Sequence, residues 1–179
     1  MSGRSQSPDA DPTVVARDIV VRALAASPRS RAELADRLAR RHVPVEAAEA
    51  VLDRFTEVGL VDDRAYAEAV VHAGQSGRGL GKRALAAELA RRGVPDPLAR
   101  EALAQVGPDD ERRAAQRLVA KRLPSLARQP RVVAERRLAG MLARKGYPSG
   151  LIWAVVQQAL DGHDDPPELP DGPQGAASP

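Results

Sequence analysis

The sequence contains three copies of one pattern, and this repeat limits the fold more than any other feature. The pattern Leu-Ala-x-x-Leu-Ala-basic-basic-x-(Val/Tyr)-Pro begins at Leu34, Leu85 and Leu138, with spacings of 51 and 53 residues. Self-similarity at a nearly constant period is typical of arrays in which one supersecondary unit stacks on the next. We therefore expect an array of three similar units.

Each copy of the pattern predicts the last part of an amphipathic helix. Leucines four residues apart form an apolar stripe, and two basic residues in the last turn complement the helix dipole. Gly93 and Gly146 suit the left-handed residue that ends a helix, and the proline two residues later prevents its continuation. Apolar residues at helical spacing also precede and follow each copy, whereas no alternating strand pattern occurs.

These patterns predict an all-α fold of three tandem three-helix repeats in an elongated, curved array. We place the repeats at residues 14–59, 60–107 and 108–161. Residues 1–13 and 162–179 are rich in Pro, Gly, Asp, Ser and Ala and offer almost no apolar side chain for burial, so both tails are expected to be disordered.

Several function classes find no support in the composition. The absence of cysteine excludes disulfides and thiolate metal sites and fits a reducing cytoplasm. No apolar run approaches the roughly 20 residues that a membrane helix needs. The Asp62–Asp63 and Asp109–Asp110 pairs stand where helices should begin, so we expect them to cap helices and not to bind metal. The histidines are scattered outside any metal or catalytic spacing: His42, His72 and His163. We expect no enzyme activity, metal or cofactor.

The charge of the chain is unevenly distributed. The net charge is +3, but the two tails are acidic, and the stretch from Arg112 to Lys145 holds eleven Lys and Arg against Glu135 alone. A basic body favours a polyanionic or acidic partner, although a solvated Arg- and Ala-rich helical protein would have the same composition. The glycine-rich segment 74–83 fails the strand–helix context of a P-loop. It is either a flexible linker or a basic loop that meets phosphate or carboxylate.

Aromatic residues are scarce. Phe55, Tyr66, Tyr147 and Trp153 are the whole set, and each falls on or beside an apolar stripe. We therefore expect them to pack in cores or helix junctions. Recognition of single-stranded bases by aromatic stacking is not expected.

The segment 57–69 resembles the most characteristic segment of RecX proteins, in which a short hydrophobic link and an Asp-Asp cap lead into a helix. Asp62, Asp63, Tyr66 and Ala67 carry this resemblance. It continues through two further motifs, Gly79-x-Gly81-Lys82-Arg83 followed by Gly93, and Leu142-x-Arg144-Lys145-Gly146-Tyr147. The likeness covers roughly residues 15–160. The chain departs from the family at Val70, where an aromatic residue is frequent, and at His72 and Gly74, where basic residues are frequent.

The resemblance implies a regulator of RecA in DNA repair and recombination. Such a protein binds RecA, especially its filament on single-stranded DNA, and blocks strand exchange and ATP hydrolysis without chemistry of its own. We expect a cytoplasmic monomer with weak, non-specific DNA contact. The cations expected to grip the filament are Arg78, Lys82, Arg83, Arg91, Arg92, Arg112, Arg113, Arg117, Lys121, Arg136, Arg137, Arg144 and Lys145.

Two alternatives stay open. First, four of these cations stand at expected helix C-termini, where their role could be capping alone, without contact to a partner: Arg91, Arg92, Arg144 and Lys145. The segment 30–62 also resembles part of a helix-turn-helix or winged-helix DNA-binding regulator, although the strand pair expected after Gly59 is missing from the sequence.

Overall fold

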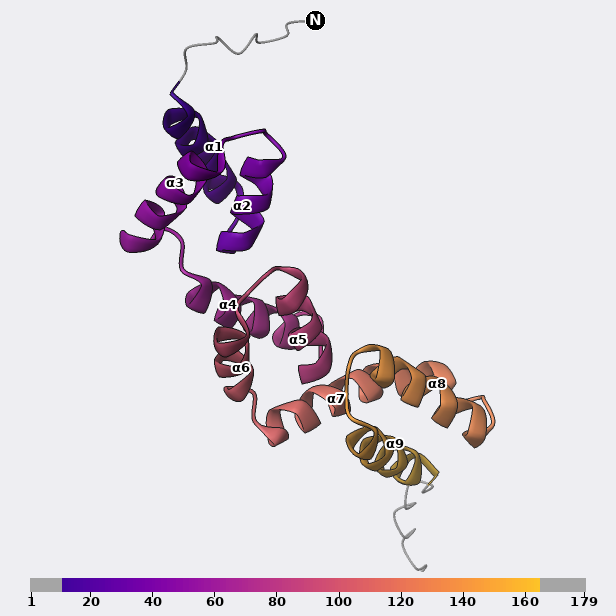
Figure 1. Cartoon of the computed structure of the whole chain (residues 1–179). Helices are drawn as coiled ribbons and strands as arrows, with labels where there is room; N and C mark the ends of the chain where they lie inside the picture. Colours follow the sequence, from indigo (N-terminus) through magenta and orange to yellow (C-terminus); the bar gives the residue numbers. More distant parts are fainter. Residues whose placement is uncertain (1–10, 165–179) are drawn as a thin grey trace, which may run out of the picture.

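The computed structural model describes residues 11–164, which form nine α-helices, one short 3-10 helix and no strand. Figure 1 shows the helices following one another along an elongated, bent array, with α1 near one end and α9 near the other. The elements are α1 (Pro12–Ala26), α2 (Arg31–Ala39), α3 (Val45–Glu57), α4 (Asp63–Ser76), α5 (Lys82–Arg91), α6 (Asp96–Ala104), α7 (Pro108–Arg122), η1 (Leu123–Leu126), α8 (Arg131–Arg144) and α9 (Ser149–Asp164). The predicted all-α array of three-helix repeats is confirmed.

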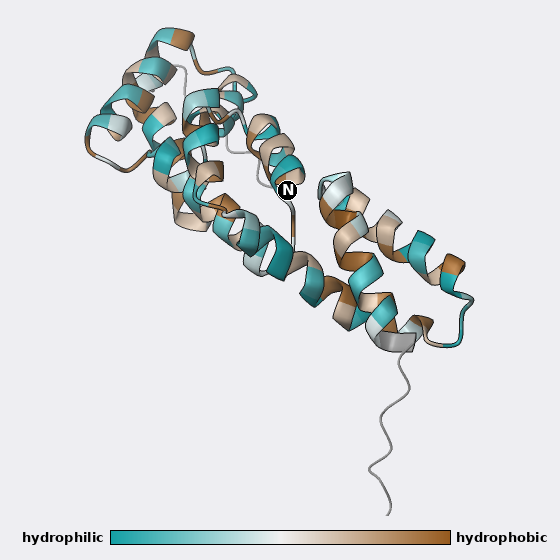
Figure 2. Cartoon of the chain, turned by 90° about the horizontal axis from the view of Figure 1, so that it is seen from below, coloured by the Kyte–Doolittle hydropathy of each residue, from teal (hydrophilic) through white to brown (hydrophobic). Residues whose placement is uncertain are grey.

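Each repeat encloses a hydrophobic core of its own. The buried residues of 11–164 form three separate apolar clusters, one within α1–α3, one within α4–α6 and one within α7–α9. The helices alternate between hydrophilic and hydrophobic segments along their length, as Figure 2 shows. The six leucines of the repeated pattern are all completely buried: Leu34, Leu38, Leu85, Leu89, Leu138 and Leu142. Each copy of the sequence pattern therefore supplies two leucines to the core of its own repeat.

The adjacent carboxylates at the start of α4 serve two different helices. Asp62 is the N-cap of α4, and its side chain accepts hydrogen bonds from the backbone N–H groups of Arg64 and Ala65. The side chain of Asp63 instead accepts a hydrogen bond of 2.7 Å from the backbone N–H of Arg31, at the start of α2. The capping role expected of this pair is confirmed, and the second cap joins two repeats.

The second helices of the three repeats, α2, α5 and α8, meet end to end. Ser30, the N-cap of α2, donates its hydroxyl proton to the backbone carbonyl of Arg92, the C-cap of α5. Gly81, the N-cap of α5, donates its backbone N–H to the carbonyl of Lys145, the C-cap of α8, at 2.8 Å. In both junctions the N-cap residue of one helix therefore donates to the C-cap carbonyl of the next, through a hydroxyl in the first and a backbone N–H in the second. These bonds satisfy helix-end groups that would otherwise lack partners.

A carboxylate from the next repeat completes each junction. Glu111 on α7 accepts a hydrogen bond of 2.9 Å from the backbone N–H of Lys82, the first residue of α5. Asp63 does the same for Arg31, the first residue of α2. In the second junction Tyr147 adds a hydrogen bond of 3.1 Å from its hydroxyl to the carbonyl of Gly79.

Glycine is required at both junctions for two reasons. Gly93 and Gly146 have φ angles of +67° and +84°, in the left-handed region that glycine tolerates best. A Cβ on Gly93 would also lie 2.4 Å from the Cβ of Ala32, and one on Gly146 would lie 2.4 Å from the backbone N of Ala84. The first repeat has His42 at the equivalent position, also with a positive φ of +58°. His42 is exposed.

Some expectations differ from the structure. The helix α1 begins at Pro12 and α9 runs to Asp164, so each extends into a predicted tail, and the rest of both tails lies outside the described residues. Phe55, Tyr66 and Tyr147 are buried as expected. Trp153 is 62% exposed, so the prediction that it packs in a core or junction is wrong.

Candidate binding site on the basic repeats

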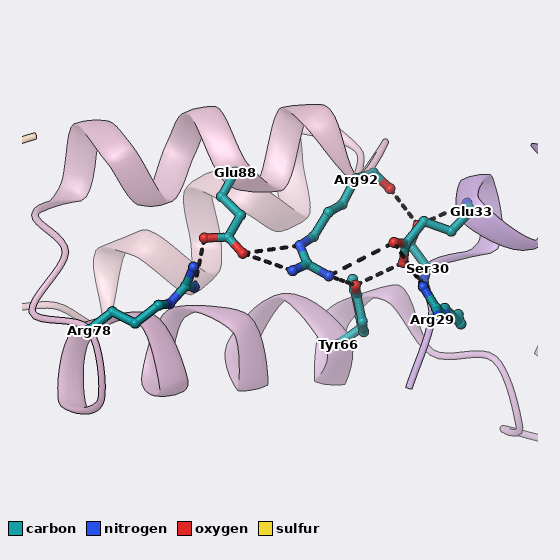
Figure 3. Close-up of polar contacts among 7 residues, drawn as sticks. All are labelled: Arg29, Ser30, Glu33, Tyr66, Arg78, Glu88 and Arg92. Carbon is teal, nitrogen blue, oxygen red and sulfur yellow. Dashed lines mark hydrogen bonds and ion pairs between the residues drawn. The ribbon is translucent and has the colours of Figure 1, made fainter. Parts of the chain in front are cut away.

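A row of charged and polar side chains runs along repeat 2 into repeat 1 (Figure 3). Its centre is Glu88 on α5, which is only 5% exposed. One oxygen of the Glu88 carboxylate accepts a hydrogen bond of 2.7 Å from the Arg78 guanidinium, and the other accepts one of 2.8 Å from Arg92. A buried carboxylate between two guanidinium groups is well compensated, which meets the general requirement for burying charge.

Arg92 extends this row across the first junction. Its Nη1 donates a hydrogen bond of 2.6 Å to the hydroxyl of Tyr66, and that hydroxyl donates one of 2.8 Å to Glu33 on α2. Since the Arg92 carbonyl also accepts the hydroxyl proton of Ser30, both ends of this residue connect repeat 2 to repeat 1. Arg92 was predicted to contact a partner, and the structure places its guanidinium in this internal network.

The network also shifts the pKa values of its members. Burial alone raises the pKa of Glu88, but the hydrogen bonds and charges of Arg78 and Arg92 outweigh it and hold that pKa below its ordinary value. Burial and the hydrogen bond to Glu33 raise the pKa of Tyr66. Burial tends to lower the pKa of Arg92, but its bonds to Tyr66 and Glu88 leave it above the ordinary value. Glu88 and Arg92 therefore stay charged at neutral pH, whereas Tyr66 stays neutral.

A second polar feature is a cationic pocket between repeats 2 and 3, with a volume of about 340 Å³. The end of α4 and the glycine-rich loop that follows it, residues 75–79, form one wall, and α7 forms another. Four cations line it and none of its lining residues is acidic: Arg78, Arg117, Lys121 and Lys145. The loop that the sequence left as either a linker or an anion-binding loop is thus one wall of a cationic pocket.

The donors in this pocket are only partly used within the protein. Lys145 donates from Nζ to the carbonyl of Arg78, whose guanidinium is bonded to Glu88. Arg117 and Lys121 form no ion pair with any residue of 11–164. The Nε2 amide of Gln75 is buried without a hydrogen-bond partner in the described structure. Unmet donors around a cavity without acid suit an anion such as a phosphate group.

The sequence did not reveal which cations meet at the glycine-rich loop. Lys82 and Arg83 follow the loop directly, and they were expected to act with it. Neither lines the pocket, and both belong to the first turn of α5. Besides Arg78 in the loop itself, the lining cations come from α7 and from the C-cap of α8, which reach the loop only through the packing of repeat 3 on repeat 2.

The remaining predicted cations are spread over the surface. Arg113 forms a 2.6 Å ion pair with Asp110, and Lys82 is partly buried. Six others are exposed and form no ion pair with a described residue: Arg83, Arg91, Arg112, Arg136, Arg137 and Arg144. On α7, Arg113, Arg117 and Lys121 are spaced by four residues, so they follow one stripe of the helix into the pocket.

Of the carboxylate pair at the start of α7, Asp110 has the capping role expected of it. Asp110 accepts the backbone N–H of Gly107 at 3.1 Å, and its hydrogen bond to Arg113, together with that cap, lowers the pKa of Asp110. Within residues 11–164, no cluster of three or more His, Asp or Glu side chains has a geometry that could hold a metal ion. No helix in the same range is both long enough and apolar enough to cross a membrane.

Comparison with known proteins assigns the family. Models described as the first, second and third three-helix domains of RecX match residues 16–55, 62–103 and 109–156. The chain belongs to the RecX family. The regulatory protein RecX of Thermobifida fusca is 45% identical over 173 residues, covering 97% of this chain and 93% of the relative. That of Streptomyces lividans is 48% identical over 154 residues, covering 86% and 82%.

Solved RecX structures share the fold. The crystal structure of RecX from Lactobacillus salivarius matches with a TM-score of 0.75 at 18% identity, covering 83% of this chain and 96% of that one. A second crystal structure, of a regulatory protein RecX, matches with a TM-score of 0.74 at 22% identity, covering 88% and 82%. Four of the residues through which the sequence resembled RecX lie at the junctions between repeats: Asp63, Tyr66, Gly93 and Gly146. Asp62 caps α4, and Ala67 is completely buried in repeat 2.

The first junction of this RecX chain should depend on pH through Glu88. We expect Glu88→Gln to lower the free energy of unfolding by about 1–2 kcal/mol at pH 7, because two partly exposed guanidiniums lose a charged partner. The folded-state pKa of Glu88 lies below the ordinary 4.5. Its stabilising effect is therefore complete above pH 4.5 and is lost as the pH falls through the lower folded-state value. Urea unfolding of both proteins from pH 7 downward should show their difference shrinking in acid.

Glu49→Gln is the matched control for this prediction. Glu49 pairs with Arg31 at an exposed position, so its loss should change stability by no more than about 1 kcal/mol. Equal effects of the two substitutions, or a difference that persists in acid, would contradict the role of Glu88.

Proposed function

We propose that this RecX-family chain restrains the RecA recombinase by binding RecA and its filament on single-stranded DNA. In this proposal it inhibits strand exchange and ATP hydrolysis in the cytoplasm as a monomer, without chemistry of its own. Family membership supports a regulatory role. The observation that carries the finer proposal is the cationic pocket, where four cations from two repeats meet without an acidic lining residue.

The charge distribution supports contact with a nucleoprotein filament. Repeat 3, at residues 108–161, holds eleven Lys and Arg against five Asp and Glu, whereas repeats 1 and 2 each have one more cation than anion. Side chains that replace counterions on phosphates bind with a strong dependence on salt, and they need no base recognition. The elongated array of three repeats (Figure 1) also presents several surfaces in succession. This arrangement suits a filament, which is itself periodic.

The test is RecA ATPase activity on single-stranded DNA, titrated with this protein. Wild type should lower the ATPase rate, and Arg117→Ala/Lys121→Ala should need about tenfold more protein for the same inhibition. Each lost phosphate contact should reduce the slope of log affinity against log salt by about 1, so this variant should lose about 2. Both residues are exposed, so the variant should melt like the parent.

Arg17→Ala/Arg100→Ala is the matched control, because it also removes two exposed cations, from α1 and α6. It should inhibit like wild type. If the pocket variant inhibits as well as this control, the pocket is not the contact.

The competing proposal is a DNA-binding regulator of the winged-helix kind. The structure has no strand in residues 11–164, so the wing is missing there. A gel shift on bare duplex DNA, compared with RecA-coated single strands, separates the two proposals. Tight binding to bare duplex, with no effect on RecA, would favour the competing one.

A further inference from the structure

The exposed tryptophan on α9 belongs neither to the hydrophobic core of repeat 3 nor to the lining of the cationic pocket. Trp153 is the only tryptophan of the chain and is 62% exposed, whereas Phe55, Tyr66 and Tyr147 are each less than 10% exposed. A large apolar side chain on the surface loses the stabilisation that burial would bring. Exposed tryptophans are frequent anchors of protein–protein contacts.

Trp153 forms one wall of an apolar groove between α8 and α9. The groove has a volume of about 320 Å³. Apart from Glu135 on α8 and Ser149 on α9, the α8 side is made of small residues and the α9 side of large apolar ones: Ala139, Gly140 and Ala143 on α8, and Ile152, Trp153 and Val156 on α9. A groove of this size and lining suits one large apolar side chain from another molecule.

Gly140 keeps the groove open, although the backbone conformation at this position does not require glycine. It lies inside α8 and does not have a positive φ. A Cβ there would meet only the end of the flexible Arg144 side chain, at 3.4 Å. Glycine in a helix interior is less favourable than alanine. The junction glycines are required by their conformation and by close contacts, whereas Gly140 is not, so the open space itself is its structural effect.

The surroundings of the groove define the charge of its occupant. The α9 segment from Ser149 to Leu160 carries no charge. On the α8 side, Arg136 and Arg144 are exposed without an ion pair in the described structure, and Glu135 is the one acidic lining residue. Val132, 71% exposed one turn before Arg136, extends the apolar surface along the same helix. An apolar groove beside arginines matches an apolar side chain that is flanked by carboxylates.

We propose that this groove is a docking site for a protein segment that presents a large apolar side chain between acidic residues. Trp153 and Gly140 are its specificity-determining positions, and Arg136 and Arg144 meet the flanking carboxylates. The identity of the partner rests on the proposed function, in which the segment belongs to RecA in the filament. The groove and the cationic pocket would then contact protein and DNA separately.

The test compares binding of wild type, Trp153→Ala and Gly140→Leu to RecA filaments on single-stranded DNA. Gly140→Leu fills the groove and improves helix propensity, so it should fold even if Trp153→Ala is destabilised. Both variants should weaken binding about 10- to 100-fold, as expected for a central aromatic anchor. The loss should persist at high salt, because the contact is apolar. Leu60→Ala, which removes a side chain 59% exposed between repeats 1 and 2, should bind like wild type.

Hydroxyl-radical footprinting read by mass spectrometry adds a direct measurement on the unmodified protein. Trp153 should lose reactivity when the filament is added. The docking site would be overturned if Trp153→Ala and Gly140→Leu bind filaments as well as Leu60→Ala does and Trp153 of the wild type stays reactive in the complex. The proposed function would remain intact. A wild type that does not bind filaments would refute both. Protection of Trp153 in the protein alone that disappears on dilution would place a second copy in the groove and overturn the proposal.

Discussion

Gly146→Ala is expected to lower the free energy of unfolding by about 2–4 kcal/mol, from a strained left-handed residue and an overpacked contact. The new Cβ would lie 2.4 Å from the backbone N of Ala84, and backbone atoms at a helix start have little room to move. The substitution should therefore separate repeat 3 from repeat 2. Urea unfolding measures the loss, and hydrogen exchange should show faster exchange at the Gly81 amide, which the junction protects.

His42→Ala is the control, since it also places alanine at a positive φ, at the same position of the repeat. No neighbouring repeat packs there, so the change should stay below about 0.5 kcal/mol, as for other surface positions. Similar losses in the two variants would mean that the junction contacts do not stabilise the array.

Leu142→Ala should unfold one repeat and leave the others folded. Leu142 is completely buried in the cluster of α7–α9, and removing such a side chain costs about 3–5 kcal/mol. Because that cluster is separate from the other two, the cost falls on repeat 3. Unfolding should become biphasic, as expected for an array held together by nearest-neighbour contacts.

Hydrogen exchange locates this effect in the chain. Protection should be lost over residues 108–164 and kept over 11–57. Leu38→Ala, at the equivalent position of repeat 1, should give the opposite pattern. A uniform loss of protection in both variants would show that the repeats unfold as one unit.

The features that were predictable from the sequence depend on neighbours along the chain. Leu85 and Leu89 lie on one helix face wherever α5 is placed, so their burial followed from spacing alone. The cap at Asp62 is similarly local. The roles of the cations were not predictable in this way. Arg92 looks like any basic residue at a helix end, and only the packing of repeat 2 on repeat 1 brings it near Glu33.

The same limit explains the cationic pocket and Trp153. Arg117 meets the glycine-rich loop because α7 crosses it, and no local pattern records that crossing. Trp153 adjoins Ile152, which is buried, but helical periodicity does not fix the width of the buried face. The residue fell just outside that face. Contacts between residues far apart in the sequence therefore explain the unpredicted roles of the cations. The uncertain width of one apolar stripe explains the wrong prediction for Trp153.

The end-to-end order of α2, α5 and α8 gives the whole array a direction. Each helix has a partial positive charge at its N-terminus and a partial negative charge at its C-terminus. At both junctions a negative end meets a positive end, so these charges largely cancel inside the molecule. The uncancelled positive end is the start of α8, whose first turn has no acidic residue. The uncancelled negative end, at α2, is followed by Arg40 and Arg41. The charge of the molecule is therefore polarised along its length, and its third repeat is the part that attracts a polyanion most strongly.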